Sequence, residues 1–238
     1  MRRRILKVLA GLLLGVVLVA LAAWTYVGYA STRDIETPAY TLAAEGNGYE
    51  VREYAPYIRA EVTLQGAYRD TLYGGFRNVA DYIFGNNTTR SAVAMTAPVL
   101  QEPAGSETIA MTAPVLHEPA ASEDIAMTAP VLHEQEGGAY TVSFIMPSSY
   151  TMETLPQPNN DKVKLRAVPK TRFAVLKFGG YATERRSARK TAWLQERLTA
   201  DGLLPAGPPI VAQYDPPWTP PYMRRNEIQI PLKDPAAG

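Results

Sequence analysis

KVKLRAVPKTRFAVLKFGG, residues 162–180, consists of two β-type runs broken at Pro169. The first half of the chain contains a segment of the same form. Residues 49–66 read YEVREYAPYIRAEVTLQG, again two β-type runs, broken here at Ala55-Pro56. The recurrence of one pattern in both halves indicates that a unit of the fold is duplicated.

The spacing within the two segments supports this duplication. Arg52 lies 14 residues before Gly66, and Arg166 lies 14 residues before Gly180. A helical pattern begins just after each glycine, at 68–84 and at about 183–201, and two further strand-like segments follow each helix. The sequence therefore predicts one α+β domain with eight antiparallel strands and two helices.

A shorter repeat lies inside the first half. IAMTAPVLHE occurs at 109–118 and at 125–134, and VAMTAPVLQE occurs at 93–102. A solenoid needs its period to continue through the chain, but this 16-residue period covers only 93–134. We interpret the repeat as one strand and its turn in triplicate, of which the half-domain needs only one copy. The surplus copies are expected as extra hairpins or as loops.

The N-terminus has the composition of a membrane segment. A basic head is followed by Val8 to Val27, which contains no charged residue. Twenty helical residues span about 30 Å, the thickness of the bilayer hydrocarbon. Residues 1–30 are therefore predicted to be an anchor that contacts the bilayer through residues 5–29, with the following domain outside the cytoplasm, periplasmic or extracellular. A cleaved signal peptide, which would give a secreted protein, is the alternative.

These patterns divide the chain. After the anchor, residues 31–48 are interpreted as a tether, 49–232 as the domain with repeats at 93–134, and 233–238 as a tail. The net charge of +1 offers no field that would attract nucleic acid. The absence of cysteine excludes disulfides, thiolate chemistry and covalent haem attachment. No catalytic motif is evident, so no enzyme activity and no metal site are predicted.

Several motifs carry a family resemblance. IAMTAPV, YTVSFIMP, TLPQPNNDKVKL, AVLKFGG and YDPPWTPPYMRRNEIQI occur in order over roughly 47–232. They resemble the SOUL family of haem-binding proteins. The resemblance implies a distorted β-barrel of two pseudo-symmetric halves flanked by two helices. With the strands counted above, the expected fold is a distorted eight-stranded antiparallel β-barrel, preceded by the N-terminal transmembrane helix. It also implies reversible, non-covalent binding of haem or a related tetrapyrrole by a carrier or buffer, without catalysis, and we expect a monomer.

The resemblance also implies a site between the first helix and the facing sheet. The cofactor-binding candidates are Tyr73, Phe76, Arg77, Tyr214 and Trp218, with Arg77 available to pair with a haem propionate. His117 and His133 occupy the same position in two repeat copies and are interpreted as exposed turn residues, not as ligands. The rival hypothesis is a module that binds another amphipathic small molecule or a protein partner, without haem.

Overall fold

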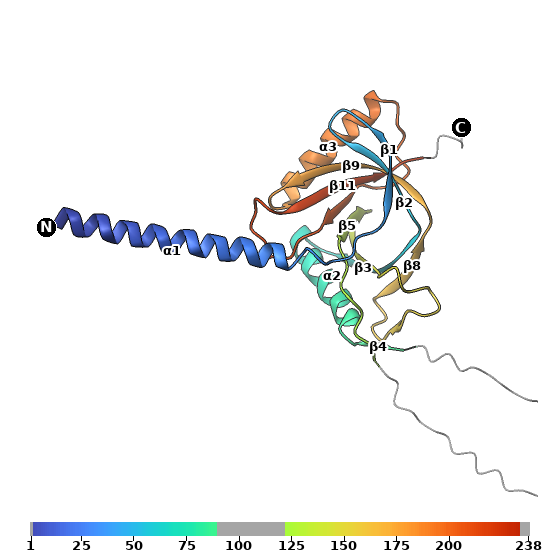
Figure 1. Cartoon of the computed structure of the whole chain (residues 1–238). Helices are drawn as coiled ribbons and strands as arrows, with labels where there is room; N and C mark the ends of the chain where they lie inside the picture. The colour runs from blue at the N-terminus through green and yellow to red at the C-terminus, as the bar shows by residue number, and fades with distance from the viewer. Residues whose placement is uncertain (1, 90–121, 234–238) are drawn as a thin grey trace, which may run out of the picture.

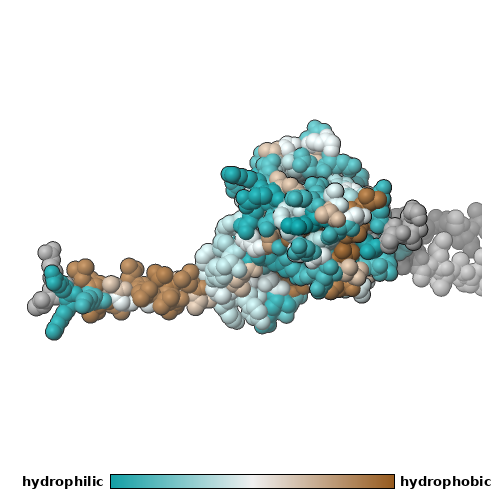
Figure 2. Space-filling view, turned by 90° about the horizontal axis from the view of Figure 1, so that it is seen from above, coloured by the Kyte–Doolittle hydropathy of each residue, from teal (hydrophilic) through white to brown (hydrophobic). Residues whose placement is uncertain are grey.

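The computed structural model describes residues 2–89 and 122–233. Helix α1 (Arg2–Ala30) projects from a domain that contains all the other elements (Figure 1). Its side chains are apolar along most of its length and hydrophilic at its outer end (Figure 2). It is the one helix of the described part that is long and apolar enough to cross a membrane, although a signal sequence near an N-terminus has the same properties.

Within the described residues the domain is built on a nine-stranded antiparallel sheet that curls into a half-barrel (Figure 1). Its order is β1-β2-β9-β11-β10-β5-β6-β3-β8. The strands are β1 (Tyr40–Glu45), β2 (Glu50–Tyr54), β3 (Tyr57–Gln65), β5 (Val131–Glu136), β6 (Ala139–Ile145), β8 (Lys164–Val168), β9 (Thr171–Gly179), β10 (Ile210–Gln213) and β11 (Arg225–Pro231). A separate ladder joins β4 (Asn87–Thr88) to β7 (Gln157–Pro158).

The predicted duplication is visible in the strand pairing. β2 and β8 each have 5 residues, and β3 and β9 each have 9. β2 pairs with β9, β3 pairs with β8, and the halves also meet where β5 pairs with β10. Proline interrupts a ladder, so the breaks at 55–56 and 169–170 separate the two strands of each half. As a result β2 and β9 lie towards one edge of the sheet, and β3 and β8 lie towards the other.

The structure differs from the predicted distorted eight-stranded barrel in two respects. The segment 31–48, which we interpreted as a tether, contains strand β1, and β1 pairs with β2. All six of its residues are exposed, so it lacks the alternation that marks a half-buried strand. The beginning of this segment is also held to the domain, because Ala129 N donates to Glu36 O at 3.0 Å. The sheet ends at β1 and β8, so the described residues form a half-barrel.

Two helices cover the sheet. Helix α2 (Tyr68–Ile83) packs on β3 and β6, and α3 (Glu184–Ala200) packs on β9 and β11. A Cβ at Gly75 would lie 2.4 Å from Cβ of Val142 on β6, so only glycine lets α2 approach this closely. The glycine in the middle of α2 therefore serves helix–sheet packing.

The third repeat copy is part of the described fold. Ile125 packs in the core under α2, and the end of the copy forms the start of β5. The other two copies lie outside the described residues. The chain on either side of residues 90–121 is joined by the Asn87 side chain. Its Nδ2 donates to Glu123 O at 2.7 Å, and its Oδ1 accepts from Glu123 N at 3.0 Å.

This closure leads to a prediction. We expect deletion of residues 90–121, which joins Thr89 to Ser122, to leave a cooperatively folding domain. Its free energy of unfolding should stay within about 2 kcal/mol of the parent, because shortening a loop changes its closure entropy only slowly. Urea unfolding of both chains measures the difference. Loss of a cooperative transition would mean that the first two copies support the fold.

Candidate functional site

The outer face of α2 carries a surface hollow. Its volume is about 460 Å³, which lies within the roughly 300–1,000 Å³ of small-molecule sites. It is shallow and open to solvent. The residues that line it are Tyr73, Phe76, Arg77, Ala80, Asp81 and Phe84. Three of the five predicted site residues therefore lie together, because positions i, i+3 and i+4 share a helix face.

Rings of different exposure form this hollow. The Phe76 ring packs on the buried Phe144 ring at 5.3 Å between centroids, which fixes Phe76 on the core. Tyr73 is 52% exposed and Phe84 is 61% exposed, so both can cover a ligand without leaving the core open. The hollow thus offers apolar ring surface to one face of a flat molecule.

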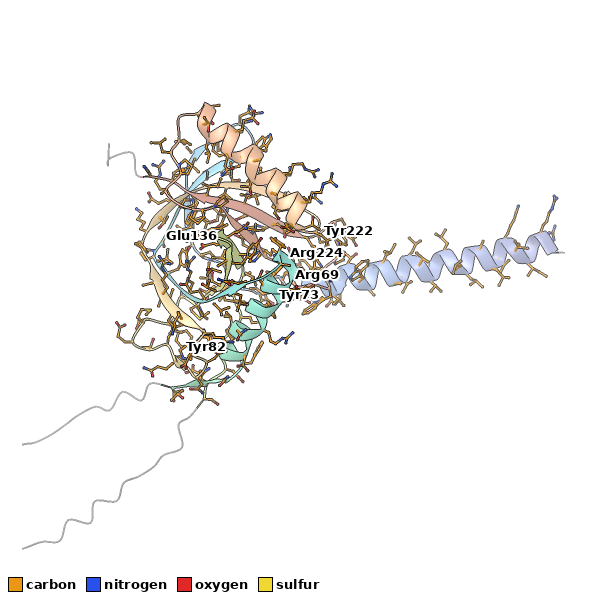
Figure 3. All side chains as sticks on the ribbon, turned by 180° about the vertical axis from the view of Figure 1, so that it is seen from behind. Arg69, Tyr73, Tyr82, Glu136, Tyr222 and Arg224 are labelled. Carbon is orange, nitrogen blue, oxygen red and sulfur yellow. The ribbon has the colours of Figure 1, made fainter. Side chains whose placement is uncertain are left out.

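Two arginines lie at the hollow: Arg77 lines it, and Arg69 lies beside Tyr73. The Arg69 guanidinium lies 5.6 Å from the centroid of the Tyr73 ring, and both side chains lie on the half of α2 nearer to α1 (Figure 3). No described residue forms an ion pair with Arg77, which is exposed. A free guanidinium beside aromatic rings can bind the carboxylate of an amphipathic ligand.

The other two predicted site residues lie elsewhere. Tyr214 is buried at the end of β10, where its hydroxyl donates to Glu227 Oε2 at 2.7 Å. Trp218 is exposed, and its indole donates to Ser31 Oγ at 3.2 Å just beyond the end of α1. Neither side chain lines the hollow, and the interface between α2 and the sheet is closed by packing at Gly75.

A polar network surrounds Tyr214 inside the half-barrel. Glu227 is fully buried and accepts from Arg52, Arg225, Tyr214 and Gln229 over 2.7–3.1 Å. Burial alone would raise the pKa of Glu227, but the hydrogen bonds from Tyr214 and Arg225 and the charge of Arg52 hold it below its usual value. This network braces the strands. Within it, Arg52 Nη2 is buried without a hydrogen-bond partner, and the Arg52 guanidinium lies 4.3 Å from the centroid of the Tyr40 ring.

The interpretation of His133 as an exposed turn residue was wrong. The ring is buried on β5, stacks on Tyr140 at 4.8 Å and meets the edge of Tyr68 at 4.6 Å. Burial lowers its pKa to about 4, so it is neutral at pH 7. It lies beneath the start of α2, where its Nε2 is 3.5 Å from Thr71 Oγ1. His117 lies outside the described residues.

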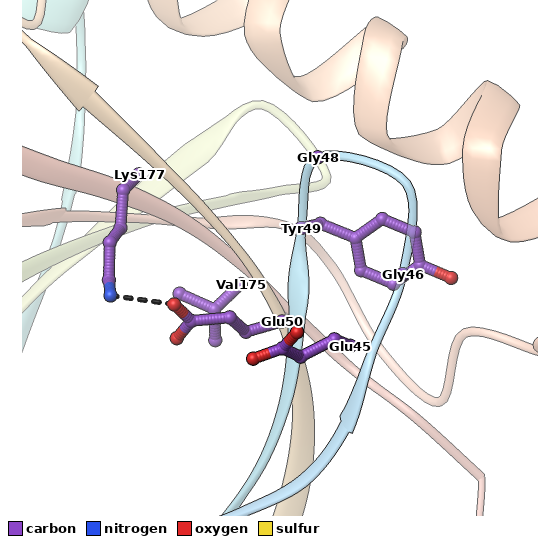
Figure 4. A pocket seen from close by; sticks show the side chains of 7 residues that line it. All are labelled: Glu45, Gly46, Gly48, Tyr49, Glu50, Val175 and Lys177. Carbon is purple, nitrogen blue, oxygen red and sulfur yellow. Dashed lines mark hydrogen bonds and ion pairs between the residues drawn. The ribbon is translucent and has the colours of Figure 1, made fainter.

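A second hollow, of about 310 Å³, lies at the turn between β1 and β2 (Figure 4). It is lined mainly by polar groups, and Lys177 Nζ binds Glu50 Oε1 there at 2.7 Å. Its cation is neutralised and it has little ring surface, so it suits a flat apolar ligand less well than the hollow on α2. Among residues 2–89 and 122–233, no three His, Asp or Glu residues are grouped closely enough to hold a metal.

A comparison with known protein families gives a match over most of the chain. The family model described as SOUL heme-binding protein matches residues 35–109 and 101–231. The chain belongs to the SOUL heme-binding protein family. The two matched segments overlap at 101–109, inside the repeats, where the extra copies interrupt the family pattern. The family is named for binding and not for a reaction. No curated protein matches the sequence.

Several solved structures are similar to this SOUL protein at low sequence identity. The EcmrR C-terminal domain is 11% identical with a TM-score of 0.48, over 82% of this chain and 98% of that one. A hydrolase from Listeria innocua is 12% identical with a TM-score of 0.46, over 80% and 94%. SAV2435 bound to tetraphenylphosphonium is 11% identical with a TM-score of 0.42, over 78% and 93%. Similarity at this level does not bear on the ligand.

Proposed function

We propose that this SOUL protein binds haem or a related tetrapyrrole reversibly and non-covalently, as a carrier or buffer, in the hollow on α2. The observation that carries the proposal is the combination of apolar rings with an unpaired guanidinium on one helix face. Tyr73, Phe76 and Phe84 would contact the macrocycle, and Arg77 would bind a propionate. We propose no catalytic step.

The proposal includes export. The basic head and the length of α1 support a single-pass anchor with the domain outside the cytoplasm. Removal of α1 as a signal peptide would give a secreted protein instead. Mass spectrometry of the mature protein distinguishes these two forms.

Hemin titration of the full chain in detergent, followed by the Soret band, tests the ligand. We expect a saturable one-to-one shift. Arg77→Ala should weaken binding about tenfold, because a hydrogen bond to a charged group contributes about 1.5 kcal/mol or more. Arg189→Ala removes an exposed arginine on α3 and is the matched control, with no expected effect.

Three results would contradict this site. A saturable shift that Arg77→Ala and Phe76→Ser leave unchanged would move the site away from α2. Loss of the shift in His117→Gln would move it to the repeats. Absence of a saturable shift would contradict haem as the ligand and favour the rival, a module for another amphipathic molecule or a protein partner.

A further inference from the structure

The last turns of α1 are bound to the proline segment, residues 215–223 (DPPWTPPYM). Trp24 Nε1 donates to Trp218 O at 2.6 Å, and Thr25 Oγ1 lies 2.5 Å from the Tyr222 hydroxyl. A Cβ at Gly28 would lie 2.8 Å from Cδ of Pro220, so glycine is needed for this close approach. These contacts fix the helix against the domain.

These contacts determine how deep the proline segment would lie in a bilayer that α1 crosses. Trp24 and Thr25 lie three and two residues before Val27, the end of the 20-residue apolar run used above to estimate the span. At 1.5 Å per residue, this is about 3–5 Å inside that end. If α1 crosses a bilayer, Trp218 and Tyr222 must therefore lie in its interfacial layer, where tryptophan and tyrosine are favoured.

The composition of the proline segment suits this layer. Residues 216–223 contain no charge, and four of the eight are prolines, which have no N–H to desolvate. Two of its side chains, Trp218 and Tyr222, are 56% and 66% exposed. Aromatic residues of this kind have an apolar ring and a polar group, and they partition to the boundary between water and hydrocarbon.

The backbone carbonyls of the segment are also satisfied. Pro216 O, Pro220 O and Pro221 O accept from the backbone N–H groups of Thr219, Met223 and Gly180 at 3.0–3.1 Å. Trp218 O accepts from Trp24, and the Arg224 guanidinium donates to Thr219 O and to Pro217 O. Six successive carbonyls therefore have donors, which lowers the cost of removing them from water.

We propose that the proline segment is a membrane-docking element that inserts Trp218 and Tyr222 into the headgroup layer of the bilayer that holds α1. This inference rests on the membrane anchoring proposed above. Arg224, stacked on Tyr181 at 4.4 Å, lies at the edge of the segment, where it can meet lipid phosphates.

Docking in this way brings the ligand hollow towards the lipid. Gly180 binds the proline segment, and Ala182 O accepts from Tyr68 at the start of α2 at 3.3 Å. In Figure 3, Arg69 and Tyr73 of α2 lie on the side of the domain from which α1 leaves. Tyr222 and Arg224 lie on the same side. An amphipathic ligand would then move between bilayer and hollow without crossing bulk water.

The absence of cysteine makes a direct test available. Single cysteines at Tyr222→Cys, at Val16→Cys in the middle of α1 and at Glu196→Cys on α3 would each carry a nitroxide. The full chain would be reconstituted in phosphatidylcholine vesicles. Collision rates with oxygen, which concentrates in lipid, and with a water-soluble nickel chelate report the depth of each label. Trp218→Cys repeats the measurement in case Tyr222→Cys disturbs the contact with α1.

We expect the oxygen-to-nickel ratio at 222 and 218 to be several-fold higher than at 196 and lower than at 16. Ratios at 222 and 218 equal to that at 196, with a lipid-like ratio at 16, would overturn docking and leave the anchor standing. A water-like ratio at 16 would overturn the anchor and docking together. The hemin titration is independent of all three outcomes.

Discussion

Glu227→Ala should lower the free energy of unfolding by about 3–5 kcal/mol, because it leaves a buried charge without its main partner. The Arg52 side chain is 0% exposed, and its Nη1 lies 3.1 Å from Glu227 Oε1. Arg225 also binds Glu227 but is 43% exposed, so it can turn towards water when the carboxylate is removed. The Arg52 guanidinium cannot turn towards water, and Glu50 remains as its one carboxylate partner.

A matched control separates burial from ion pairing as such. Glu53→Ala removes an ion pair with Lys170 in which both side chains are partly exposed, 31% and 64%. This change should cost less than about 1 kcal/mol. Urea unfolding of the full chain in detergent compares the two variants. An equal cost for both would mean that water reaches the interior of the half-barrel and that the network does not brace it.

Glu227→Gln refines this test, because it removes the charge but keeps a side chain of the same shape. The Tyr214 hydroxyl can still donate to the remaining carbonyl oxygen, so the loss should be smaller than for alanine. A loss as large as that of Glu227→Ala would show that charge alone, and not the hydrogen bonds, accounts for the stabilisation.

The duplication was predictable because proline breaks and glycine ends are local signals. The equal spacings across Pro56 and Pro169 indicated two consecutive strands in each half, and the structure contains them as β2 and β3 and as β8 and β9. Which of these strands pair with each other was not predicted. Strand β1 was not predictable in this way. Its residues are all exposed, and its pairing with β2 depends on a partner supplied by the fold.

The candidate site was predictable only where helical geometry determines direction. Tyr73, Phe76 and Arg77 share a face of α2 whatever the helix packs on. The direction of Tyr214, which follows the end of β10, depends on the register of β10 against β11, which no local pattern reveals. His133 had a usable signal, since Gly137 and Gly138 form the turn between β5 and β6 and therefore extend the strand through the histidine.

The burial of His133 makes stability depend on pH. Its pKa is about 4 in the folded chain, against about 6.5 for an unperturbed histidine. Between these values the unfolded chain binds more protons than the folded chain, so stability is fully present above pH 6.5 and falls as the pH is lowered. From pH 6.5 to pH 5 we expect a loss of about 2 kcal/mol from this residue, at 1.36 kcal/mol per pH unit.

The repeats provide both the variant and its control. His133→Gln introduces the residue that the first copy has at Gln101, and it should abolish most of the dependence of stability on pH between 6.5 and 5. His117→Gln makes the same change in the second copy. The third copy completes the described fold, so the pH dependence should remain in this control. Urea unfolding at several pH values measures both. An unchanged slope in His133→Gln would mean that the imidazole reaches water in the folded chain, in conflict with its position between Tyr68 and Tyr140.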